Sequence, residues 1–492
     1  MDIQLIQCSF RYELENVSRL FFFTEGVRVV DEPDEARCIR ALEEPQDGGW
    51  LCTIRLTMDG QTRESAELVA AERPDDPRCE YALTLMLYRL LTRTTPVRPG
   101  WGILTGVRPA KLVGQLRGRG MDERQTLDYL QSHYLVTPEK AALAVETAER
   151  ERQITEASRP EDCSLYISIP FCPSRCSYCS FVSQAVETEN KLMAQYVGLL
   201  CRELACVGEK LRANGLRLRT VYFGGGTPGV LSAEQMRLLT GCVAERFDLS
   251  ALEEYTVEVG RPDTVTREKL EVLRAAGVDR VSINPQTMND EVLRAVGRRH
   301  TARQTVDAYR LARETGFGCI NMDLIAGLPG DTLPSFENTL EQIIALDPEN
   351  ITVHTLSLKR AATLQTEKYD RKLLYANPAA EMMDYTLRRI RPAGYAPYYM
   401  YRQKNTLGNL ENIGFSRDGH FGRYNVYIME ETHTILAVGA GSVTKLVDRE
   451  HNRIRRVFDY KYPSEYVNGF DEMLRRKDEI DTFYAEDVSA GN

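Results

Sequence analysis

The sequence lacks the features of a membrane or secreted protein. No apolar run among its 492 residues is long enough to cross a bilayer, and its first residues do not form a basic leader before an apolar segment. We therefore expect a cytoplasmic protein with no membrane span. A basic excess is also missing, since 62 Lys and Arg against 71 Asp and Glu give a formal charge of −9. This balance argues against a general nucleic-acid coat protein and predicts no nucleic-acid partner.

Repeats, low-complexity tracts and disulfide-type cysteine spacing are missing as well. Twelve cysteines in a chain of this length do not form a disulfide framework, so each is expected to be a core residue or a metal ligand. Nine of them are scattered and form no cluster motif, which predicts buried structural thiols. These nine are Cys8, Cys38, Cys52, Cys79, Cys163, Cys201, Cys206, Cys242 and Cys319.

The sequence does contain enough apolar residues, 43%, for a large core, and its length allows roughly three domains. Residues 1–158 are predicted to form an N-terminal α/β domain of unknown role. No catalytic group of residues is recognisable in this part. Its signals are a hairpin at Asp59 and Gly60, an apolar helix over 79–94, and two helices within 121–157 that break at Thr137 and Pro138.

From residue 159 the pattern changes to short β-branched runs that alternate with helical segments, as in parallel βα folds. Six such runs predict an incomplete (β/α)6 TIM-like barrel over 159–360, in which chemistry gathers at the carboxyl ends of the strands. Residues 361–492 are predicted to form a C-terminal α+β extension that covers the substrate, with helices over 379–391 and near 465–476. The predicted strands are 165–169, 220–223, 255–259, 280–283, 319–325 and 350–356, and the helices between them are 191–211, 233–247, 267–275, 290–295, 302–314 and 334–346.

The first predicted barrel strand runs into a loop with three closely spaced cysteines, in the sequence IPFCPSRCSYCSF. The spacing of Cys172, Cys176 and Cys179 lets one loop wrap a 4Fe–4S cluster, which normally takes four thiolates. With three local ligands, one iron would keep an open position for an exchangeable ligand. A zinc site and three packed core cysteines are the alternatives. Zinc is disfavoured because no His or Cys lies between Ser180 and Leu200.

Glycines and polar residues follow the next predicted strands. The second strand ends in a GGGTP segment from Gly224, where glycines let backbone groups approach a ligand without a Cβ clash. The third strand delivers Glu258, the fourth precedes Gln286, and the fifth contains Asp323. Carboxylates and amides at barrel strand ends suit ribose hydroxyls and an ammonium group. Alternatively, the glycines form a plain turn, and each polar residue caps an element or joins a core salt bridge.

The run Y-x-x-I-P-F-C-x3-C-x2-C-x-F, which begins at Tyr166, resembles the oxygen-independent coproporphyrinogen III oxidase group of radical S-adenosylmethionine (SAM) proteins. This group includes HemN, HemW and HemZ, and the sequence ISIPFCPSRCSYCSF is most similar to the HemZ branch. The resemblance is strong over 163–360 and weaker to about residue 475. It implies that the central fold is a radical SAM barrel and that the cofactors are a 4Fe–4S cluster and SAM.

The resemblance also implies a radical chemistry and a set of site residues. In such proteins SAM chelates the unique iron through its amino and carboxylate groups, and one electron from the reduced cluster cleaves it to a 5′-deoxyadenosyl radical. Arg299 and His300, which follow Arg298 in the sequence, are expected to be a solvated helix end. The resemblance assigns Cys172, Cys176 and Cys179 to the cluster, and it implies a catalytic role for Tyr166 near it. It assigns the SAM contacts as follows: Gly225, Gly226 and Thr227 contact the methionine amino group, Arg298 pairs with the methionine carboxylate, and Glu258, Gln286 and Asp323 bind the cofactor, the last two at its ribose. It also implies that Gly439 and Gly441 form a turn that closes the site, for which a plain hairpin is the alternative.

Three positions depart from other branches of the group. Ser168 stands where other branches have a histidine, and Phe181 stands where the HemN branch has a further cysteine. Lys404 replaces the histidine of the HNxxYW motif that HemW proteins carry. Because lysine is not an ordinary axial haem ligand, this replacement disfavours a haem chaperone.

The resemblance therefore implies oxidative decarboxylation of two propionates of coproporphyrinogen III, which yields the vinyl groups of protoporphyrinogen IX in haem biosynthesis. The radical would remove a hydrogen atom from the propionate β-carbon. The substrate would then lose carbon dioxide and one electron. A low-potential donor such as flavodoxin or ferredoxin is the expected partner. The alternatives are a haem-binding carrier with a regulatory cluster and a radical enzyme that modifies a porphyrin. The candidate contacts for the tetrapyrrole are Arg360, Arg402, Lys404, Tyr398, Tyr399 and Tyr401.

Overall fold

The structure is a computed structural model that describes residues 1–492 apart from 24, 182, 187–189, 358–377, 404–405 and 491–492. The chain divides into two compact units. Among the described residues, the first unit holds Met1–Glu146 and Arg402–Leu410, and the second holds the other residues from Thr147 onward. No helix in this described part is long and apolar enough to cross a membrane.

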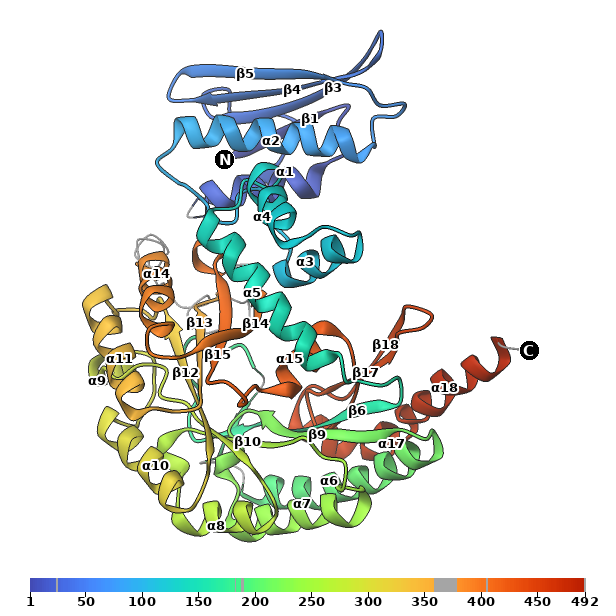
Figure 1. The fold of residues 1–492 in the computed structure, drawn as a ribbon, viewed down its shortest axis with the longest axis vertical. Helices are drawn as coiled ribbons and strands as arrows, with labels where there is room; N and C mark the ends of the chain where they lie inside the picture. The colour runs from blue at the N-terminus through green and yellow to red at the C-terminus, as the bar shows by residue number, and fades with distance from the viewer. Residues whose placement is uncertain (24, 182, 187–189, 358–377, 404–405, 491–492) are drawn as a thin grey trace. The chain divides into compact units, whose positions relative to one another are not determined.

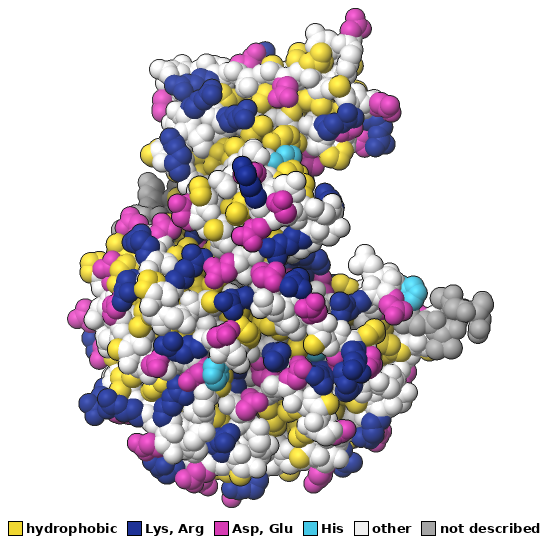
Figure 2. All heavy atoms as spheres, in the orientation of Figure 1, with side chains coloured by type: hydrophobic (Ala, Val, Ile, Leu, Met, Phe, Trp, Pro, Cys, Tyr) yellow, Lys and Arg dark blue, Asp and Glu magenta, His cyan; other side chains and the backbone are white. Residues whose placement is uncertain are grey.

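Acidic and basic side chains are interspersed over the face of the molecule that Figure 2 shows. The mixture is found on both units. It is the surface expected when 62 Lys and Arg nearly balance 71 Asp and Glu and both kinds of charge remain in water.

The first unit is built on a five-stranded sheet (Figure 1). The hairpin predicted at Asp59 and Gly60 is confirmed, and its two strands pair antiparallel. Successive side chains of a strand point to opposite faces, so Ile39, Ala41 and Ile54 on the two central strands all lie in the core. In sheet order the strands are β2 (Arg28–Val29), β1 (Asp2–Ile6), β3 (Cys38–Gln46), β4 (Gly49–Met58) and β5 (Gln61–Val69).

Helices complete the first unit. The predicted apolar helix begins at Pro77, because the Asp76 side chain accepts a hydrogen bond from the Arg78 amide at 2.8 Å. The helix break predicted at Thr137 is also confirmed, since a new helix begins at Pro138. The helices are α1 (Arg11–Phe21), α2 (Pro77–Thr94), α3 (Pro109–Gly118), α4 (Glu123–Ser132) and α5 (Pro138–Thr155), whose last residues belong to the second unit.

The second unit is built on an eleven-stranded sheet, and its central six strands are the predicted ones. They run parallel, and each is hydrogen-bonded to the next in chain order. The first and last of the six pair with other strands instead of with each other, so the barrel is incomplete, as predicted. These strands are β6 (Asp162–Ile169), β9 (Arg217–Gly225), β10 (Glu254–Gly260), β11 (Arg280–Ile283), β12 (Cys319–Ala326) and β13 (Asn350–Thr355).

The helices between these strands lie along the outer side of the sheet (Figure 1). Two of them, α7 and α10, begin at a capping box, in which Ser232 or Thr301 accepts a hydrogen bond from the third helical amide and a glutamine side chain accepts one from the capping residue's amide. All six predicted helices are confirmed within a few residues. They are α6 (Asn190–Ala213), α7 (Ala233–Arg246), α8 (Arg267–Ala275), α9 (Asp290–Ala295), α10 (Ala302–Glu314) and α11 (Leu333–Leu346), with short 3-10 turns η2 (Pro228–Val230) and η3 (Pro262–Thr264) after β9 and β10.

The C-terminal part of the chain adds strands at both ends of the six-stranded run, an arrangement that the sequence did not predict. At one end β15 (Glu411–Ser416) pairs antiparallel with β13, and β14 (Ala396–Arg402) lies beside it. At the other end β16 (Thr434–Val438) pairs parallel with β6, and β17 (Val443–Asp448) and β18 (Arg453–Phe458) follow. The remaining elements are α14 (Ala379–Ile390), η4 (Leu407–Asn409) and α15 (Arg423–Glu430).

The prediction of a single final helix near 465–476 is wrong. Two short helices, α16 (Pro463–Asn468) and α17 (Phe470–Arg476), replace it, and α18 (Asp478–Ala490) follows. The chain bends at Gly469, which packs so closely on Tyr460 that a Cβ there would lie 2.4 Å from the tyrosine ring. A glycine inside a helical pattern therefore ended the helix.

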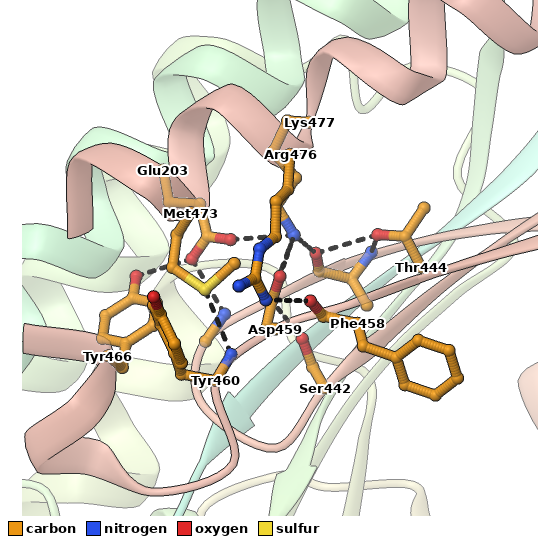
Figure 3. A network of polar contacts seen from close by, with 12 residues as sticks. Glu203, Ser442, Thr444, Phe458, Asp459, Tyr460, Tyr466, Met473, Arg476 and Lys477 are labelled. Carbon is orange, nitrogen blue, oxygen red and sulfur yellow. Dashed lines mark hydrogen bonds and ion pairs between the residues drawn. The ribbon is translucent and has the colours of Figure 1, made fainter. Parts of the chain in front are cut away.

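A buried ion network ties this C-terminal segment to α6 (Figure 3). Lys477 is fully buried, and its Nζ lies 2.9 Å from Glu203 Oε1 and 2.8 Å from Asp459 Oδ1. The same ammonium donates to the Ala437 carbonyl at 2.7 Å, and Tyr466 donates to Glu203 Oε2 at 2.5 Å. Since water does not reach these charges, removal of one leaves the others buried without compensation.

We expect Lys477→Met to lower the free energy of unfolding by about 3–5 kcal/mol, because two carboxylates lose their buried counter-charge. Urea unfolding of the full chain, followed by circular dichroism, measures the change. The matched control is Arg303→Met, which breaks an exposed ion pair with Asp307 on α10 and should change the same quantity by about 0.3–0.5 kcal/mol. Equal shifts of the two variants would contradict the role given to the buried network.

Candidate functional site

The three motif cysteines lie in the loop that follows β6. Cys176 is buried, whereas Cys172 and Cys179 are partly buried. Burial raises the pKa of the Cys172 thiol, and it raises the pKa of Cys179 to about 11. These thiols therefore hold their protons at neutral pH unless a cation stabilises the thiolates.

One backbone and one side-chain hydrogen bond fix the middle of this loop against the residues that follow α9. The Ser177 amide donates to the Val296 carbonyl at 3.0 Å, and the Ser174 hydroxyl donates to the Gly297 carbonyl at 3.1 Å. Within the loop, two short strands pair in parallel and close its base. They are β7 (Phe171–Cys172) and β8 (Gln184–Ala185).

The glycine segment after β9 lies directly against the start of the cysteine loop. The Gly226 amide donates to the Ile169 carbonyl at 2.9 Å, and the Thr227 amide donates to the Phe171 carbonyl at 2.8 Å. A Cβ on Gly226 would lie 2.6 Å from the Phe171 oxygen, so no other residue fits. The Thr227 hydroxyl also donates to Cys172 Sγ at 3.4 Å. Gly226 and Thr227 therefore hold the start of the cysteine loop in place.

Three tyrosines stack beside the predicted carboxylate of β10. Tyr166 on β6 and Tyr222 on β9 lie opposite each other in the sheet, and Tyr424 of α15 stacks on both, with its ring centre 4.4 Å from that of Tyr222. The Tyr222 hydroxyl donates to Glu258. Burial raises the pKa of Glu258 to about 7, and this effect outweighs the hydrogen bond, which lowers it.

A second cluster of polar side chains lies on β12 and β13. Asp323 Oδ1 accepts a hydrogen bond from the Asn321 amide group at 2.8 Å, and its Oδ2 lies 4.0 Å from His354 Nε2. The Tyr401 hydroxyl lies 3.5 Å from the other ring nitrogen of that histidine. Asp323 is therefore held by neighbours but remains partly exposed.

Gln286 lies next to Asp323 through the backbone. Its amide donates to the Asp323 carbonyl at 2.9 Å, and its carbonyl accepts from the Ile325 amide at 3.0 Å. Gln286 adopts a φ of 69°, a left-handed conformation that costs energy in a residue with a Cβ and that these two bonds maintain.

Three buried polar atoms near the end of β11 have no hydrogen-bond partner among the described residues. They are Asn284 Oδ1, Gln286 Oε1 and Arg298 Nε. The other guanidinium nitrogens of Arg298 donate to the Tyr178 hydroxyl at 2.9 Å and to the Asn284 carbonyl at 2.6 Å. Buried polar atoms without partners are costly, and they suit a polar ligand that completes their hydrogen bonds.

One expectation near Arg298 is wrong, and one buried residue was missed. His300 is 2% exposed, so the expectation of a solvated helix end is wrong for this residue, whereas Arg299 is exposed. The burial of His300 lowers its pKa to about 3. Arg261, to which we assigned no role, is 3% exposed and donates to the Ser174 hydroxyl of the cysteine loop at 2.6 Å. The sequence signal that could have identified Arg261 is its position just after β10, because polar residues at the carboxyl ends of barrel strands are candidate site residues.

The predicted glycine turn lies between β16 and β17, beside the end of β6. The Gly439 amide donates to Glu203 Oε2 at 2.9 Å, and the Ala440 amide donates to the Tyr196 hydroxyl at 2.8 Å. The Ser168 hydroxyl donates to the Ala440 carbonyl at 2.8 Å. Ser168, at a position where other branches carry histidine, therefore binds this turn.

The predicted tetrapyrrole contacts are only partly described. Arg360 and Lys404 lie outside the described residues. Arg402 is buried in the first unit, where its guanidinium donates to the carbonyls of Leu104, Gly106 and Asn409, so it offers little to a substrate carboxylate. Tyr398 and Tyr399 are buried core residues, and Tyr401 is partly exposed.

The expectation that all nine scattered cysteines are buried is only partly correct. Cys38, Cys52, Cys79 and Cys163 are buried, whereas Cys8, Cys201, Cys206, Cys242 and Cys319 are partly buried. Several of the last group lie on helices that face both the sheet and water.

Residues 166–343 match the radical SAM superfamily. The chain is 40% identical over 398 residues to the oxygen-independent coproporphyrinogen-III oxidase-like protein HemZ of Bacillus subtilis (strain 168), across 80% of this chain and 79% of that protein. It is 30% identical over 325 residues to the heme chaperone HemW of Lactococcus lactis subsp. lactis (strain IL1403), across 65% of this chain and 79% of that protein. Coproporphyrinogen III oxidase (HemN) from Escherichia coli superposes with a TM-score of 0.49 at 24% identity, across 67% of this chain and 73% of that chain.

The fold and these similarities define a radical SAM protein, whose superfamily uses a 4Fe–4S cluster and SAM. Within that superfamily the chain belongs to the oxygen-independent coproporphyrinogen III oxidase-like group that includes HemZ and HemW. The residues present fit both cofactors. Three cysteines share one loop, and the unpartnered atoms of Asn284, Gln286 and Arg298 suit the polar groups of SAM.

We expect Gly226→Ala to prevent stable assembly of the cluster. The new Cβ, 2.6 Å from the Phe171 oxygen, would push the start of the cysteine loop away from its place. Iron and sulfide per chain after anaerobic reconstitution measure the effect. The control is Gly198→Ala on α6, where a Cβ meets nothing within 4 Å, and this change should stabilise the chain by about 0.5–1 kcal/mol. Full cluster content in Gly226→Ala would contradict the positioning role.

Glu258→Gln should weaken the pH dependence of folding in the apoprotein. Burial raises the pKa of Glu258 from 4.5 to about 7, so between these values the folded state holds a proton that the unfolded state releases. The contribution of this carboxyl to the free energy of unfolding therefore falls as pH rises, by about 1.4 kcal/mol per pH unit. Urea unfolding across that window measures the slope. Glu268→Gln, at an exposed position of α8, should leave the slope unchanged.

Proposed function

We propose that this chain is a radical SAM enzyme that converts coproporphyrinogen III to protoporphyrinogen IX without oxygen, in haem biosynthesis. The observation that carries the proposal is the loop of three cysteines, held against the glycine segment and next to buried polar atoms that lack partners. The kinship with HemZ supports the substrate class. When bound and reduced, the cluster and SAM supply a 5′-deoxyadenosyl radical, which would take one hydrogen atom from a propionate. The remaining electron, lost with carbon dioxide, would pass to a separate one-electron acceptor.

In this proposal the thiolates of Cys172, Cys176 and Cys179 hold the cluster. Their loop is anchored at both its start and its middle, so the three sulfurs are ordered before the cluster arrives. Such preorganisation reduces the entropy lost on binding. The partial exposure of Cys172 and Cys179 leaves a side from which a further ligand can approach.

The SAM contacts follow from the polar atoms at the strand ends. Arg298 holds the methionine carboxylate, and its unpartnered Nε adds a donor to the two nitrogens already engaged. Gln286 and Asp323, joined by a backbone hydrogen bond, bind the ribose hydroxyls together. The remaining proposed contacts are Gly225, Gly226 and Thr227 with the methionine amino group, and Glu258 with the cofactor.

Tyr166 is the proposed catalytic residue. Its ring is partly exposed and stacks on Tyr424, so its position is fixed. Burial raises the pKa of Tyr166, and the phenol therefore keeps its proton at neutral pH. A protonated phenol can donate a hydrogen bond to a polar group of the substrate and can hold that group in place.

The proposed partners are a low-potential electron donor, such as flavodoxin or ferredoxin, and a tetrapyrrole substrate. Among the predicted substrate contacts, Arg360 and Lys404 remain the proposed cations for the propionates, because Arg402 is already engaged by three carbonyl groups. The second candidate function is a haem carrier, which the similarity to HemW favours. Lys404, where HemW proteins carry histidine, favours the enzyme.

The test is anaerobic incubation of the reconstituted protein with coproporphyrinogen III, SAM and a chemical reductant. We expect 5′-deoxyadenosine and protoporphyrinogen IX to form together. Cys172→Ala should lose the cluster absorbance near ~400 nm and both products, because one of three cluster ligands is gone. Cys206→Ala, which removes a partly buried thiol of α6, should keep both.

Each other outcome has a definite meaning. Deoxyadenosine without a decarboxylated product would retain the radical chemistry and reject this substrate. Stable binding of one haem per chain, together with no product from coproporphyrinogen III, would establish the carrier instead. An intact cluster in Cys172→Ala would overturn the proposed ligands.

A further inference from the structure

A carboxylate occupies a core position in the sheet of the first unit. Along β3, the side chains of Ile39, Ala41 and Glu43 point to the same face, because successive side chains alternate. Ile39 and Ala41 belong to the apolar core beneath this face, and Glu43 is likewise fully buried, at 0% exposure. An ionised side chain in such a row is unfavourable unless an opposite charge accompanies it.

Two cysteines lie next to this carboxylate. Cys52 of β4 is the direct cross-strand partner of Glu43, and Cys79 comes from the first turn of α2, which packs against the sheet. Both thiols are fully buried. The carboxylate oxygen of Glu43 and the sulfurs of Cys52 and Cys79 all lie within 4.8 Å of one another.

A third cysteine completes the group. Cys8 follows β1, and its thiol interacts with the Glu43 carboxylate and with Cys52. The neighbouring Ser9 amide donates to Glu43 Oε2 at 3.2 Å. The other carboxylate oxygen, Oε1, is buried and has no hydrogen-bond partner within the described residues.

The described part of the chain supplies no cation to this group. None of its Lys, Arg or His side chains forms an ion pair with Glu43, although Asp2, Arg40 and other residues of the same sheet are paired. The ligand atoms of Glu43, Cys52 and Cys79 therefore lie close together, the thiol of Cys8 interacts with the same carboxylate, and one acceptor atom, Glu43 Oε1, is left unsatisfied. A bound metal ion would supply the missing charge.

We propose that Cys8, Glu43, Cys52 and Cys79 form a metal site that binds one soft divalent ion of the zinc type. Thiolate sulfur and carboxylate oxygen are ordinary zinc ligands, and four of them match tetrahedral coordination. With bonds of about 2.3 Å to sulfur, ligand atoms in a tetrahedron lie about 3.8 Å apart, so the ligand atoms of Glu43, Cys52 and Cys79, now within 4.8 Å of one another, need only a small contraction. Cys8 is the proposed fourth ligand, because its thiol interacts with the Glu43 carboxylate. On binding, each thiol releases its proton to water, and the thiolate takes its place on the ion.

The surface next to the group favours cation entry. A depression of about 550 Å³ lies there, and Ser9 and Glu80, the chain neighbours of Cys8 and Cys79, are among its lining residues. Four of its side chains are acidic and one is basic, which raises the local concentration of cations. The lining residues are Ser9, Phe10, Arg11, Tyr12, Glu13, Glu15, Asp75 and Glu80.

A disulfide between Cys52 and Cys79 is the competing use of the same thiols. It would leave the Glu43 carboxyl group buried beside an apolar S–S bond with Oε1 still unpaired, so it does not account for this unsatisfied oxygen. The metal site accounts for all four side chains. It does not depend on the function proposed for the second unit.

The experiment uses the full chain with Cys172, Cys176 and Cys179 replaced by Ala, so that the loop thiols cannot bind the probe. Zinc per chain is measured by elemental analysis after dialysis, and cobalt(II) is titrated in place of zinc to detect thiolate coordination from its charge-transfer and tetrahedral d–d bands. We expect one ion per chain. In this background Cys52→Ser should raise the dissociation constant more than about 100-fold, since even an outer partner of a ligand is worth 10–100-fold.

The matched control is Cys38→Ser, another fully buried thiol of the same sheet, which lies beside Thr57 and outside the group. It should bind zinc as tightly as the parent. Cys8→Ser, at a partly exposed position, provides a second variant that should fold in case Cys52→Ser does not. Glu43→Gln should also weaken binding while leaving the cobalt–thiolate band.

Several results would overturn the site. These are zinc well below one per chain in the parent, unchanged affinity in Cys8→Ser, an equal loss in Cys38→Ser, or a Cys52–Cys79 disulfide in protein purified without oxygen. Failure of coproporphyrinogen III oxidation in the unmodified protein would bear only on the proposed function, because zinc binding is read without catalysis.

Discussion

The close contact between the cysteine loop and the glycine segment is the constraint on which the rest of the site depends. β6 and β9 pair so that Ser168 lies opposite Gly224 and Ile169 opposite Gly225, and the two chains stay together beyond the strands through hydrogen bonds from Gly226 and Thr227. Only a residue without a Cβ permits this approach at Gly226. The start of the cysteine loop is therefore positioned by backbone packing.

Around this contact the second unit collects polar groups from distant parts of the chain. Tyr424 of α15 stacks on Tyr166 and Tyr222 of the first two strands, and the hydroxyl of the latter donates to Glu258. The raised pKa of that carboxyl is the energetic consequence of placing it among aromatic rings. The C-terminal helix α15 thus packs a ring against the first two barrel strands.

The C-terminal segment contributes in a second way, through the turn at Gly439. Glu203 accepts hydrogen bonds from this turn and from Tyr466, and it balances the buried charge of Lys477. Ser168, at the end of β6, donates to the same turn. The ion network thus stabilises the strand that leads into the cysteine loop. In the first unit, by contrast, Glu43 is a buried carboxyl group whose Oε1 has no partner among the described residues, and a metal ion is the proposed ligand.

Local patterns in the sequence determined the central strands, the helices between them and the spacing of Cys172, Cys176 and Cys179, because these features depend on residues close together in the chain. Tertiary structure alone decided the partners that lie far apart. The stacking of Tyr424, the burial of His300, the engagement of Arg402 by carbonyl groups and the strands added at both sheet ends have no local signal. The group of Cys8, Glu43, Cys52 and Cys79 is the clearest case, since strand pairing and helix packing bring together residues whose spacing forms no motif.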